Sequence, residues 1–273
     1  MTQNINYQSI QSSQIYINSN TADIYINNTM KSNVVFFFKQ PIQLFKNSLE
    51  MRVSLVNAQI PMSFYNITSN NNTLYISGVK YTFPIGNYNV DTFIKTWMSL
   101  FSGWSLTYNN ITNQMTFYNS SYTVFTFAGT DNSLLPVIGF DKNQVYISNN
   151  QSLTSAYVCN FLGITRLHVK SNTFSLMNVD SRNKGRNRTL AVIPVNASNN
   201  GMLLYNNFTN FKTGFKNKEI SVLNIEIQDD DKNYIDFQNQ DWTMCLQIDI
   251  LCEFNENLED MEDVYNNLVN ELY

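Results

Sequence analysis

The sequence contains a single histidine, His168, and the chemistry open to an imidazole depends on its neighbours. His168 lies in the segment RLHVK, with no serine or cysteine nucleophile pattern nearby. A catalytic triad needs such a nucleophile, and a histidine-based zinc site needs further ligands. We therefore interpret His168 as an ordinary strand residue, predict no catalytic residue, and expect that the chain is not an enzyme.

The acidic segment QDDDKNYIDFQNQ invites comparison with a calcium loop. Asp229, Asp231 and Asn233 have the 1, 3, 5 spacing of an EF-hand. An EF-hand also needs glycine at position 6 and a bidentate glutamate at position 12, where this chain has Tyr234 and Gln240. The flanking segments have strand patterns instead of helix patterns. We favour a solvated loop between strands over an ion site at Asp229–Asp231, and we predict neither a metal nor a cofactor.

Four basic residues lie close together in the segment DSRNKGRNR, namely Arg182, Lys184, Arg186 and Arg188. One interpretation is a contact with phosphate or with an acidic partner. The other, which we favour, is a solvated basic loop before a strand that starts near Thr189. Because no aromatic residues interleave with the basic ones, we expect a protein partner before a nucleic acid if this segment binds anything.

Composition favours β-structure and limits the partners. Hydrophobic residues make up 43% of the chain and charged residues 14%, and there are 19 Phe and 16 Tyr, which suit pleated sheets. A net charge of −4 argues against a chain that binds polyanions as a whole. No signal-peptide pattern or membrane-length apolar run occurs, so we expect a soluble chain that is not secreted by the standard route.

Two further residue types carry little functional signal. Cys159, Cys245 and Cys252 are too few and too scattered for a disulfide framework or a zinc site, so we expect reduced, structural cysteines. Matches to the Asn-x-Ser/Thr pattern, such as that at Asn66, are expected by chance in an asparagine-rich chain.

One amphipathic helix is predicted in a chain that otherwise favours strands. Asn89 is a good N-cap, and a single apolar stripe follows it, made of Val90, Phe93, Ile94, Trp97, Met98 and Phe101. Hairpin patterns flank this helix: LYISGVKYTF turns at Ser77-Gly78, and WSLTYNNITNQMTFYN forms the second hairpin. These elements predict a compact α+β module in which the helix covers a small sheet.

The longest strand pattern lies near the C-terminus, in WTMCLQIDILCEF (242–254). Alternate residues from Trp242 to Phe254 are apolar, and most of the residues between them are polar. A long strand with one apolar face is typical of a large β-sandwich. The last residues, 256–273, combine acidic residues with apolar residues at helical spacing, which predicts an acidic amphipathic tail helix.

Several segments, in this order, resemble the minor capsid (penton) proteins of virophages and Polinton-type viruses. They are SLVNAQIP, TFPIGNYNVDTFIKTW, YNNITNQMTFYN and LLPVIGF, followed by RTLAVIPV and LNIEIQDDDKNYIDFQNQDWTMCLQIDI. The resemblance covers residues 34 to 254. It implies an all-β fold, a single jelly-roll β-sandwich with a small α+β insertion. It also implies a homopentamer that forms the vertex of an icosahedral virion beside double-jelly-roll major capsid proteins.

On this basis we divide the chain into four parts. Residues 31–63 and 150–255 would form the jelly roll, residues 64–149 the inserted module, and residues 256–273 the acidic tail. The module would project from the vertex, where it could contact a host receptor. Residues 1–30 would form an arm on neighbouring subunits, because their short apolar alternations need a foreign sheet edge or groove, and a disordered terminus is the alternative.

Two other function classes compete with the capsid hypothesis. A β-sandwich could serve as a receptor- or glycan-binding module of a virus or phage, and its assembly state would then be a trimer or a monomer. A polysaccharide hydrolase would need two carboxylates facing each other across a cleft, whereas the acidic residues here gather in one loop and the tail.

Overall fold

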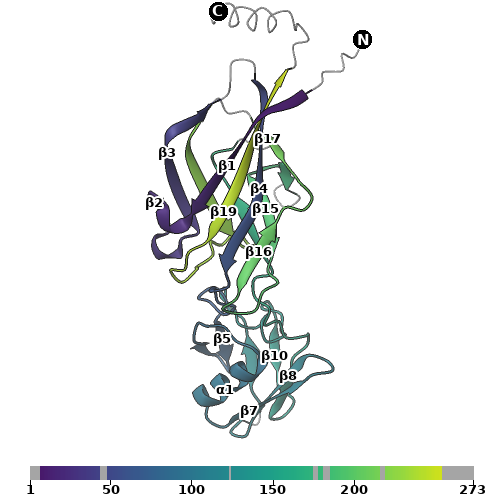
Figure 1. The fold of residues 1–273 in the computed structure, drawn as a ribbon. Coiled ribbons are helices and arrows are strands. Elements are labelled where there is room, and N and C mark those ends of the chain that lie inside the picture. Colours follow the sequence, from purple (N-terminus) through teal and green to yellow (C-terminus); the bar gives the residue numbers. More distant parts are fainter. Residues whose placement is uncertain are drawn as a thin grey trace, which may run out of the picture.

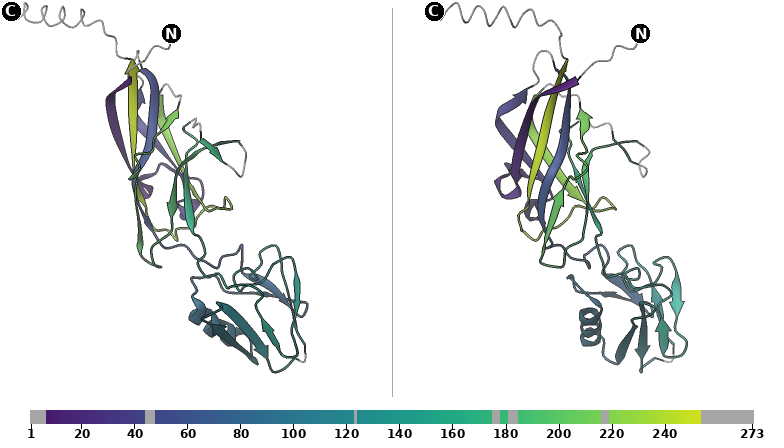
Figure 2. Two further views of the ribbon diagram at one scale, coloured as in Figure 1. Left: turned by 90° about the vertical axis from the view of Figure 1, so that its right-hand side faces the viewer. Right: turned by 45° about the vertical axis from the view of Figure 1, so that its right-hand side comes forward.

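The computed structural model describes residues 7–43, 48–122, 124–174, 178–180, 185–215 and 219–253. Within these ranges the chain forms a long β-sandwich and a smaller module that is attached to one end of it (Figures 1 and 2). Strand β1 starts and strand β19 ends at the opposite end of the sandwich (Figure 1). The molecule is therefore elongated, with the chain entering and leaving far from the module.

Two five-stranded antiparallel sheets form the sandwich. The first has the order β1-β19-β4-β16, with β17 also paired to β4, and the second has the order β15-β12-β18-β3-β2. The strands of the first sheet are β1 (Tyr7–Asn18), β19 (Thr243–Glu253), β4 (Ser48–Pro61), β16 (Met202–Asn206) and β17 (Thr213–Phe215). Those of the second are β15 (Thr189–Pro194), β12 (Arg166–Lys170), β18 (Glu219–Gln228), β3 (Asn33–Gln43) and β2 (Ile24–Tyr25).

Shorter elements complete the sandwich. They are the 3-10 helices η1 (Ser19–Thr21) and η2 (Asn28–Met30) and the small ladder of β13 (Asn178–Asp180) with β14 (Gly185–Asn187).

Alternation along β19 and its neighbours builds the sandwich core. Met244, Leu246, Ile248 and Ile250 are buried between the sheets together with Trp242, which confirms the predicted one-faced pattern. Residues from both sheets contribute to this one core, so the sheets are packed face to face.

The outer face of β19 is more buried than its alternation predicts. Cys245 and Asp249 are both almost fully covered, Asp249 through contacts with Ser12 of β1 and with Lys212. The loop that precedes β17 supplies Lys212, and β1 supplies Ser12. Segments distant in sequence therefore bury polar side chains on the outside of this sheet.

The module has its own core and two small sheets. Their orders are β10-β9-β5-β6 and β11-β8-β7. The elements are β5 (Thr73–Ile76), β6 (Val79–Thr82), α1 (Val90–Leu100), β7 (Trp104–Asn109), β8 (Gln114–Asn119), β9 (Thr126–Ala128), β10 (Val145–Ile147) and β11 (Ser152–Thr154). Within the described ranges α1 is the only α-helix, and no helix there is long and apolar enough to cross a membrane.

Local signals in the module act as the sequence predicts. The Asn89 side chain accepts a hydrogen bond from the Thr92 N–H (2.9 Å), and the Thr92 hydroxyl accepts one from the Asn89 N–H (2.9 Å), which completes a capping box. Ser77 and Gly78 both have positive φ, as a tight hairpin turn requires. Trp97 of α1 is fully buried among aromatic rings, including those of Phe101 and Phe117.

Two expectations about the division of the chain are wrong. Residues 7–18, expected to belong to an arm on neighbouring subunits, form β1 and pair along their length with β19 of the same chain. Residues 152–154, expected in the jelly roll, form β11, which pairs with β8 of the module. In both cases the pairing partner is distant in sequence, so local pattern could not identify it. The expected tail, residues 256–273, lies outside the described residues.

Candidate functional site at the junction of sandwich and module

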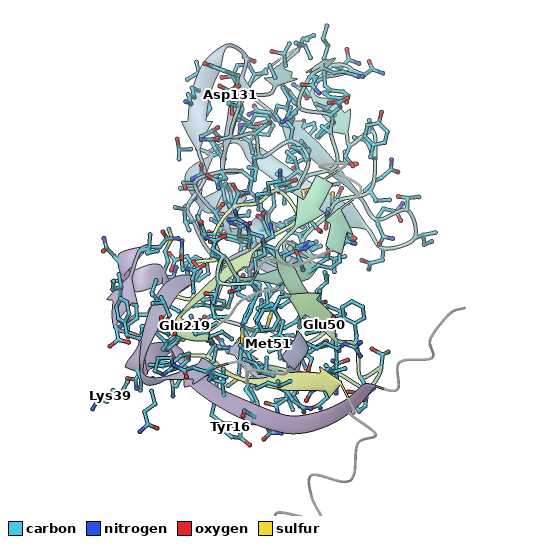
Figure 3. All side chains as sticks on the ribbon, turned by 90° about the horizontal axis from the view of Figure 1, so that it is seen from above. Tyr16, Lys39, Glu50, Met51, Asp131 and Glu219 are labelled. Atoms are coloured by element: carbon cyan, nitrogen blue, oxygen red, sulfur yellow. The ribbon has the colours of Figure 1, made fainter. Side chains whose placement is uncertain are left out.

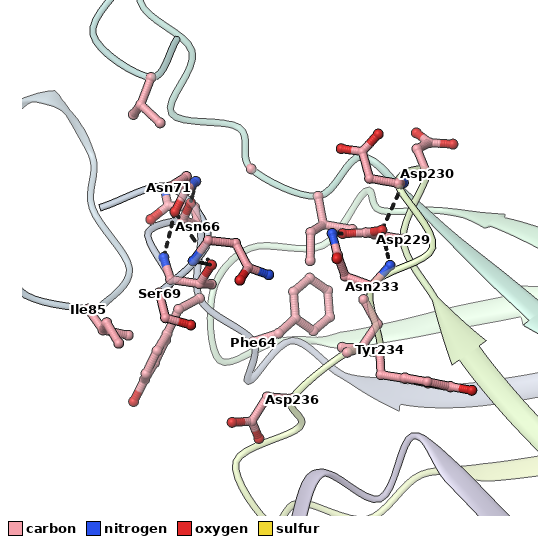
Figure 4. A pocket seen from close by; sticks show the side chains of 18 of the residues that line it. Phe64, Asn66, Ser69, Asn71, Ile85, Asp229, Asp230, Asn233, Tyr234 and Asp236 are labelled. Carbon is pink, nitrogen blue, oxygen red and sulfur yellow. Dashed lines mark hydrogen bonds between the residues drawn. The ribbon is translucent and has the colours of Figure 1, made fainter. Parts of the chain in front are cut away.

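The chain crosses between the sandwich and the module twice, through residues 62–66 on the way out and 161–165 on the way back. A cleft of about 570 Å³ lies beside these crossings. One of its walls is the loop from Asp229 to Gln238, which joins β18 to β19, and the module supplies another that includes Asp131 and Lys142. Figure 4 shows Asp229 on the loop and, across the cleft, Asn71 and Ile85 of the module. The cleft thus joins residues from both units.

Asn66 connects the two crossings. Its Nδ2 donates to the backbone carbonyls of Tyr88 (2.7 Å) and Phe161 (2.8 Å), and its Oδ1 accepts from the Tyr88 N–H (2.9 Å). Its backbone carbonyl also accepts from Asn71 Nδ2 (2.9 Å). One amide side chain therefore holds the outgoing crossing, the entry to α1 and the returning crossing together.

Gly163 permits this close approach. It has φ +67°, a conformation that favours glycine, and a Cβ built there would lie 2.6 Å from the Cβ of Asn66. Both requirements, the backbone angle and the space, exclude a larger residue without rearrangement. Neither residue stands out in the sequence, because Asn66 is one of many Asn-x-Ser/Thr matches and Gly163 has no motif around it.

The acidic loop organises itself through Asp229. Its Oδ1 accepts from the N–H groups of Asp231 and Asn233 (2.8 Å each), and its Oδ2 accepts from Asn233 Nδ2 (3.0 Å) (Figure 4). The 1, 3, 5 spacing that resembles a calcium loop thus builds a turn stabilised by its own side chain. Among the residues that the structure describes, no group of three or more His, Cys, Asp or Glu side chains is placed to hold a metal ion.

His168 lies in β12, at the edge of this region, and contacts an aspartate. Its Nε2 is 2.9 Å from Asp230 Oδ1, while Arg166 Nε donates to Asp230 Oδ2 at 3.1 Å. Arg166 and Asp230 are partly exposed, so the ion pair is screened and contributes little stability. The group anchors the acidic loop to β12, and it contains no nucleophile.

Tyr234 attaches the same loop to two strands of the second sheet. Its hydroxyl donates to Glu226 Oε2 (3.3 Å) and accepts from Asn33 Nδ2 (3.2 Å). Burial, together with the negative charge of Glu226, raises the pKa of the Tyr234 hydroxyl. Tyr234 therefore stays neutral near pH 7 and acts as a hydrogen-bonding link between β3 and β18.

The basic cluster is described only in part. Arg182 and Lys184 lie outside the described residues, and only the backbone of Arg186 is described, in β14. Arg188 is exposed, and its guanidinium donates to Asn172 Oδ1. A partner contact through these four residues stays a prediction.

Comparisons with known proteins identify the fold. No protein-family model and no curated protein matches the sequence. A crystal structure of the mavirus penton protein matches with a TM-score of 0.50 and 12% sequence identity, over 88% of this chain and 100% of that one. A chain in the cryo-EM structure of the Sputnik virophage matches with a TM-score of 0.41 and 12% identity, over 87% of this chain and 97% of that one. The mavirus match confirms the predicted jelly-roll sandwich with its small α+β insertion.

Proposed function

We propose that this chain is a structural capsid protein that forms the pentameric vertex, or penton, of an icosahedral viral shell. The observation that carries the proposal is the fold match to the mavirus penton protein, which extends over that whole chain and most of this one. A match to the sandwich alone would be weak support, because jelly rolls serve many functions. Here the match spans 88% of this chain, more than its sandwich alone supplies.

The elongated shape supports the proposal. Strands of the sandwich run along the long axis, with the module at one end and the start of β1 and the end of β19 at the other (Figure 2). Standing upright in a shell, such a subunit would direct its module away from the surface. Its flanks would contact double-jelly-roll major capsid proteins, and the protein would be located in the virion. We propose the module as the part that could contact a host receptor.

The proposed role is structural, so it requires no cofactor and no catalytic residue. The contacts at the junction agree with this role, because they hold two units in place. Asp229 in the acidic cleft stabilises its own loop, and we propose no second function for this cleft.

Mass in solution tests the proposed function first. Light scattering coupled to size exclusion should give five times the chain mass of 31.6 kDa, about 158 kDa. Co-expression with a double-jelly-roll major capsid protein should then place this chain at the five-fold vertices of shells imaged by cryo-electron microscopy. A stable trimer that binds glycans and never enters shells would reject the penton function in favour of a receptor- or glycan-binding module.

A further inference from the structure

The first sheet of the sandwich has two edges, β1 on one side and, on the other, β16 followed by the short β17 along the same strand β4. Within the described part of the chain β1 pairs only with β19, and β16 pairs only with β4. The sequence of β1, YQSIQSSQIYIN, has no charged residue and no proline. Natural sheets protect long edges with charges, prolines or bulges, and β1 has only a single bulge, between Ser9 and Gln11.

Successive residues of β1 direct their backbone N–H and C=O groups alternately to β19 and to the free edge of the sheet. The Ser19 N–H donates to the Trp242 carbonyl (3.0 Å). Because hydrogen-bonded and non-hydrogen-bonded pairs alternate in an antiparallel ladder, Ile15 and Ile17 exchange hydrogen bonds with β19. Gln14 and Tyr16 direct their N–H and C=O groups to the free edge. Their side chains are exposed on the outer face, while Ile15 and Ile17 are buried in the core.

The opposite edge has the same arrangement. The Asn207 N–H donates to the Val56 carbonyl (2.9 Å), so by the same alternation Leu203 and Tyr205 face β4. Leu204 directs its backbone groups to the free edge and its side chain to the outer face. Its side chain is 66% exposed, and that of Tyr16 is 76% exposed. Figure 3 shows Tyr16 on the outside of β1, directed away from the core in which Met51 lies.

We propose that the β1 edge of one copy of this chain pairs with the β16 edge of the next copy, and that this contact closes the ring. The inference rests on the proposed function, since it names the surfaces that hold the pentamer together. A head-to-tail contact between two different edges is heterologous, and such contacts generate closed rings when the rotation fits.

Strand direction and side-chain face both agree with this pairing. Neighbours in β1-β19-β4-β16 are all antiparallel, so β1 and β16 run in opposite directions. A rotation about an axis along the strands preserves direction, so β1 would meet the β16 of the next copy antiparallel. At both edges, the residues whose backbone groups face the free edge have their side chains on the outer face of the sheet. Pairing the two edges would therefore place the inner face of one copy's sheet beside the inner face of the next copy's sheet.

The pairing register between two copies follows from the residues that lie side by side across the first sheet. Tyr16 pairs with Cys245, Cys245 with Asn57, and Asn57 with Asn206. A rotation axis parallel to the strands therefore brings Tyr16 opposite Asn206 of the next copy, with Leu204 as its diagonal neighbour. A tilt that shifts the register by two residues brings Tyr16 directly opposite Leu204. In either case two exposed apolar side chains become neighbours on one face, as cross-strand pairs do in stable sheets.

Charge variants at the two edges test the contact. We expect Tyr16→Glu and Leu204→Lys each to raise the concentration for half-maximal pentamer formation at least tenfold, because each places a lone charge in the interface. Combining them should restore assembly to within about threefold of wild type, because the two charges are then neighbours across the interface. Val222→Lys, a substitution on the outer face of the second sheet, is the matched control and should assemble like wild type.

A backbone variant addresses the pairing itself. Tyr16→Pro removes an N–H that faces the free edge and that lies opposite β16 in either register, so the ladder with β19 is retained and the variant should fold. Its melting temperature should stay close to that of wild type while its assembly weakens at least tenfold. Circular dichroism of every variant separates loss of assembly from loss of folding.

Failure of the inference is distinct from failure of the penton function. If wild type is pentameric and the four edge variants are pentameric too, the β1–β16 contact is rejected and the penton function stands. A wild type that stays monomeric at all concentrations also rejects the contact, and incorporation into shells then decides the function separately. If the single variants weaken assembly but the double variant does not recover, the two side chains are not neighbours and the proposed pairing is wrong.

Discussion

Replacing Asn66 with alanine should loosen the attachment of the module to the sandwich. The substitution removes three side-chain hydrogen bonds, two to the carbonyls of Tyr88 and Phe161 and one from the Tyr88 N–H. Each such bond contributes about 1 kcal/mol net, so Asn66→Ala should lower the free energy of unfolding by about 3 kcal/mol. Asn66 is half-buried, and water can reach part of the site, which argues for this value over a larger one.

The assay is denaturant unfolding followed by fluorescence, with thermal unfolding in parallel. For a cooperative unit of this size, 3 kcal/mol corresponds to a fall in melting temperature of roughly 6–12 °C. Asn70→Ala is the matched control, because Asn70 is exposed and its backbone N–H, which the substitution leaves in place, bonds to Thr68. If Asn66→Ala changes the free energy of unfolding by less than about 0.5 kcal/mol, the amide does not hold the two crossings together.

Three further perturbations follow from the structure. Burial raises the pKa of the Asp249 carboxyl, but hydrogen bonds from Lys212 and other donors outweigh burial and hold the pKa below its usual value. The stability that ionised Asp249 contributes is therefore present above the unfolded-state pKa and is lost as pH falls through the folded-state pKa. Asp249→Asn should flatten the acid limb of a stability–pH curve. Trp97→Ala should destabilise the module by about 3–5 kcal/mol in calorimetry, because it empties a fully buried aromatic site, and an unchanged trace would contradict that packing. Millimolar Ca²⁺ should shift the melting temperature by less than about 1 °C, because Asp229 is already hydrogen-bonded within its loop, and a larger rise would indicate an ion site.

Local elements were predictable because their signals lie within a few residues of each other. The one-faced pattern of β19, the capping box at Asn89 and the turn at Ser77-Gly78 each depend on period or on short-range hydrogen bonds. His168 was placed in a strand for the same reason, and its segment forms β12. These features together were enough to predict a sandwich with an α+β module.

The candidate site was not predictable, because its contacts join residues far apart in the chain. Asn66 bonds to Phe161, 95 positions later, and nothing in the residues around Asn66 marks it as different from other asparagines in this asparagine-rich chain. The acidic segment was predicted as a loop between strands, but the sequence did not show that the Asp229 side chain stabilises the turn.

The sequence by itself determined where strands, turns and the helix form, since backbone propensity, apolar period and capping act over one or two turns of chain. Only the tertiary structure decided that β1 pairs with β19 of its own sandwich, that β11 belongs to the module, and that Asn66 joins the two crossings. Each of these depends on which distant strand or carbonyl lies opposite. Apolar alternation specifies the face that a strand buries, and it does not specify the partner against which the strand is paired.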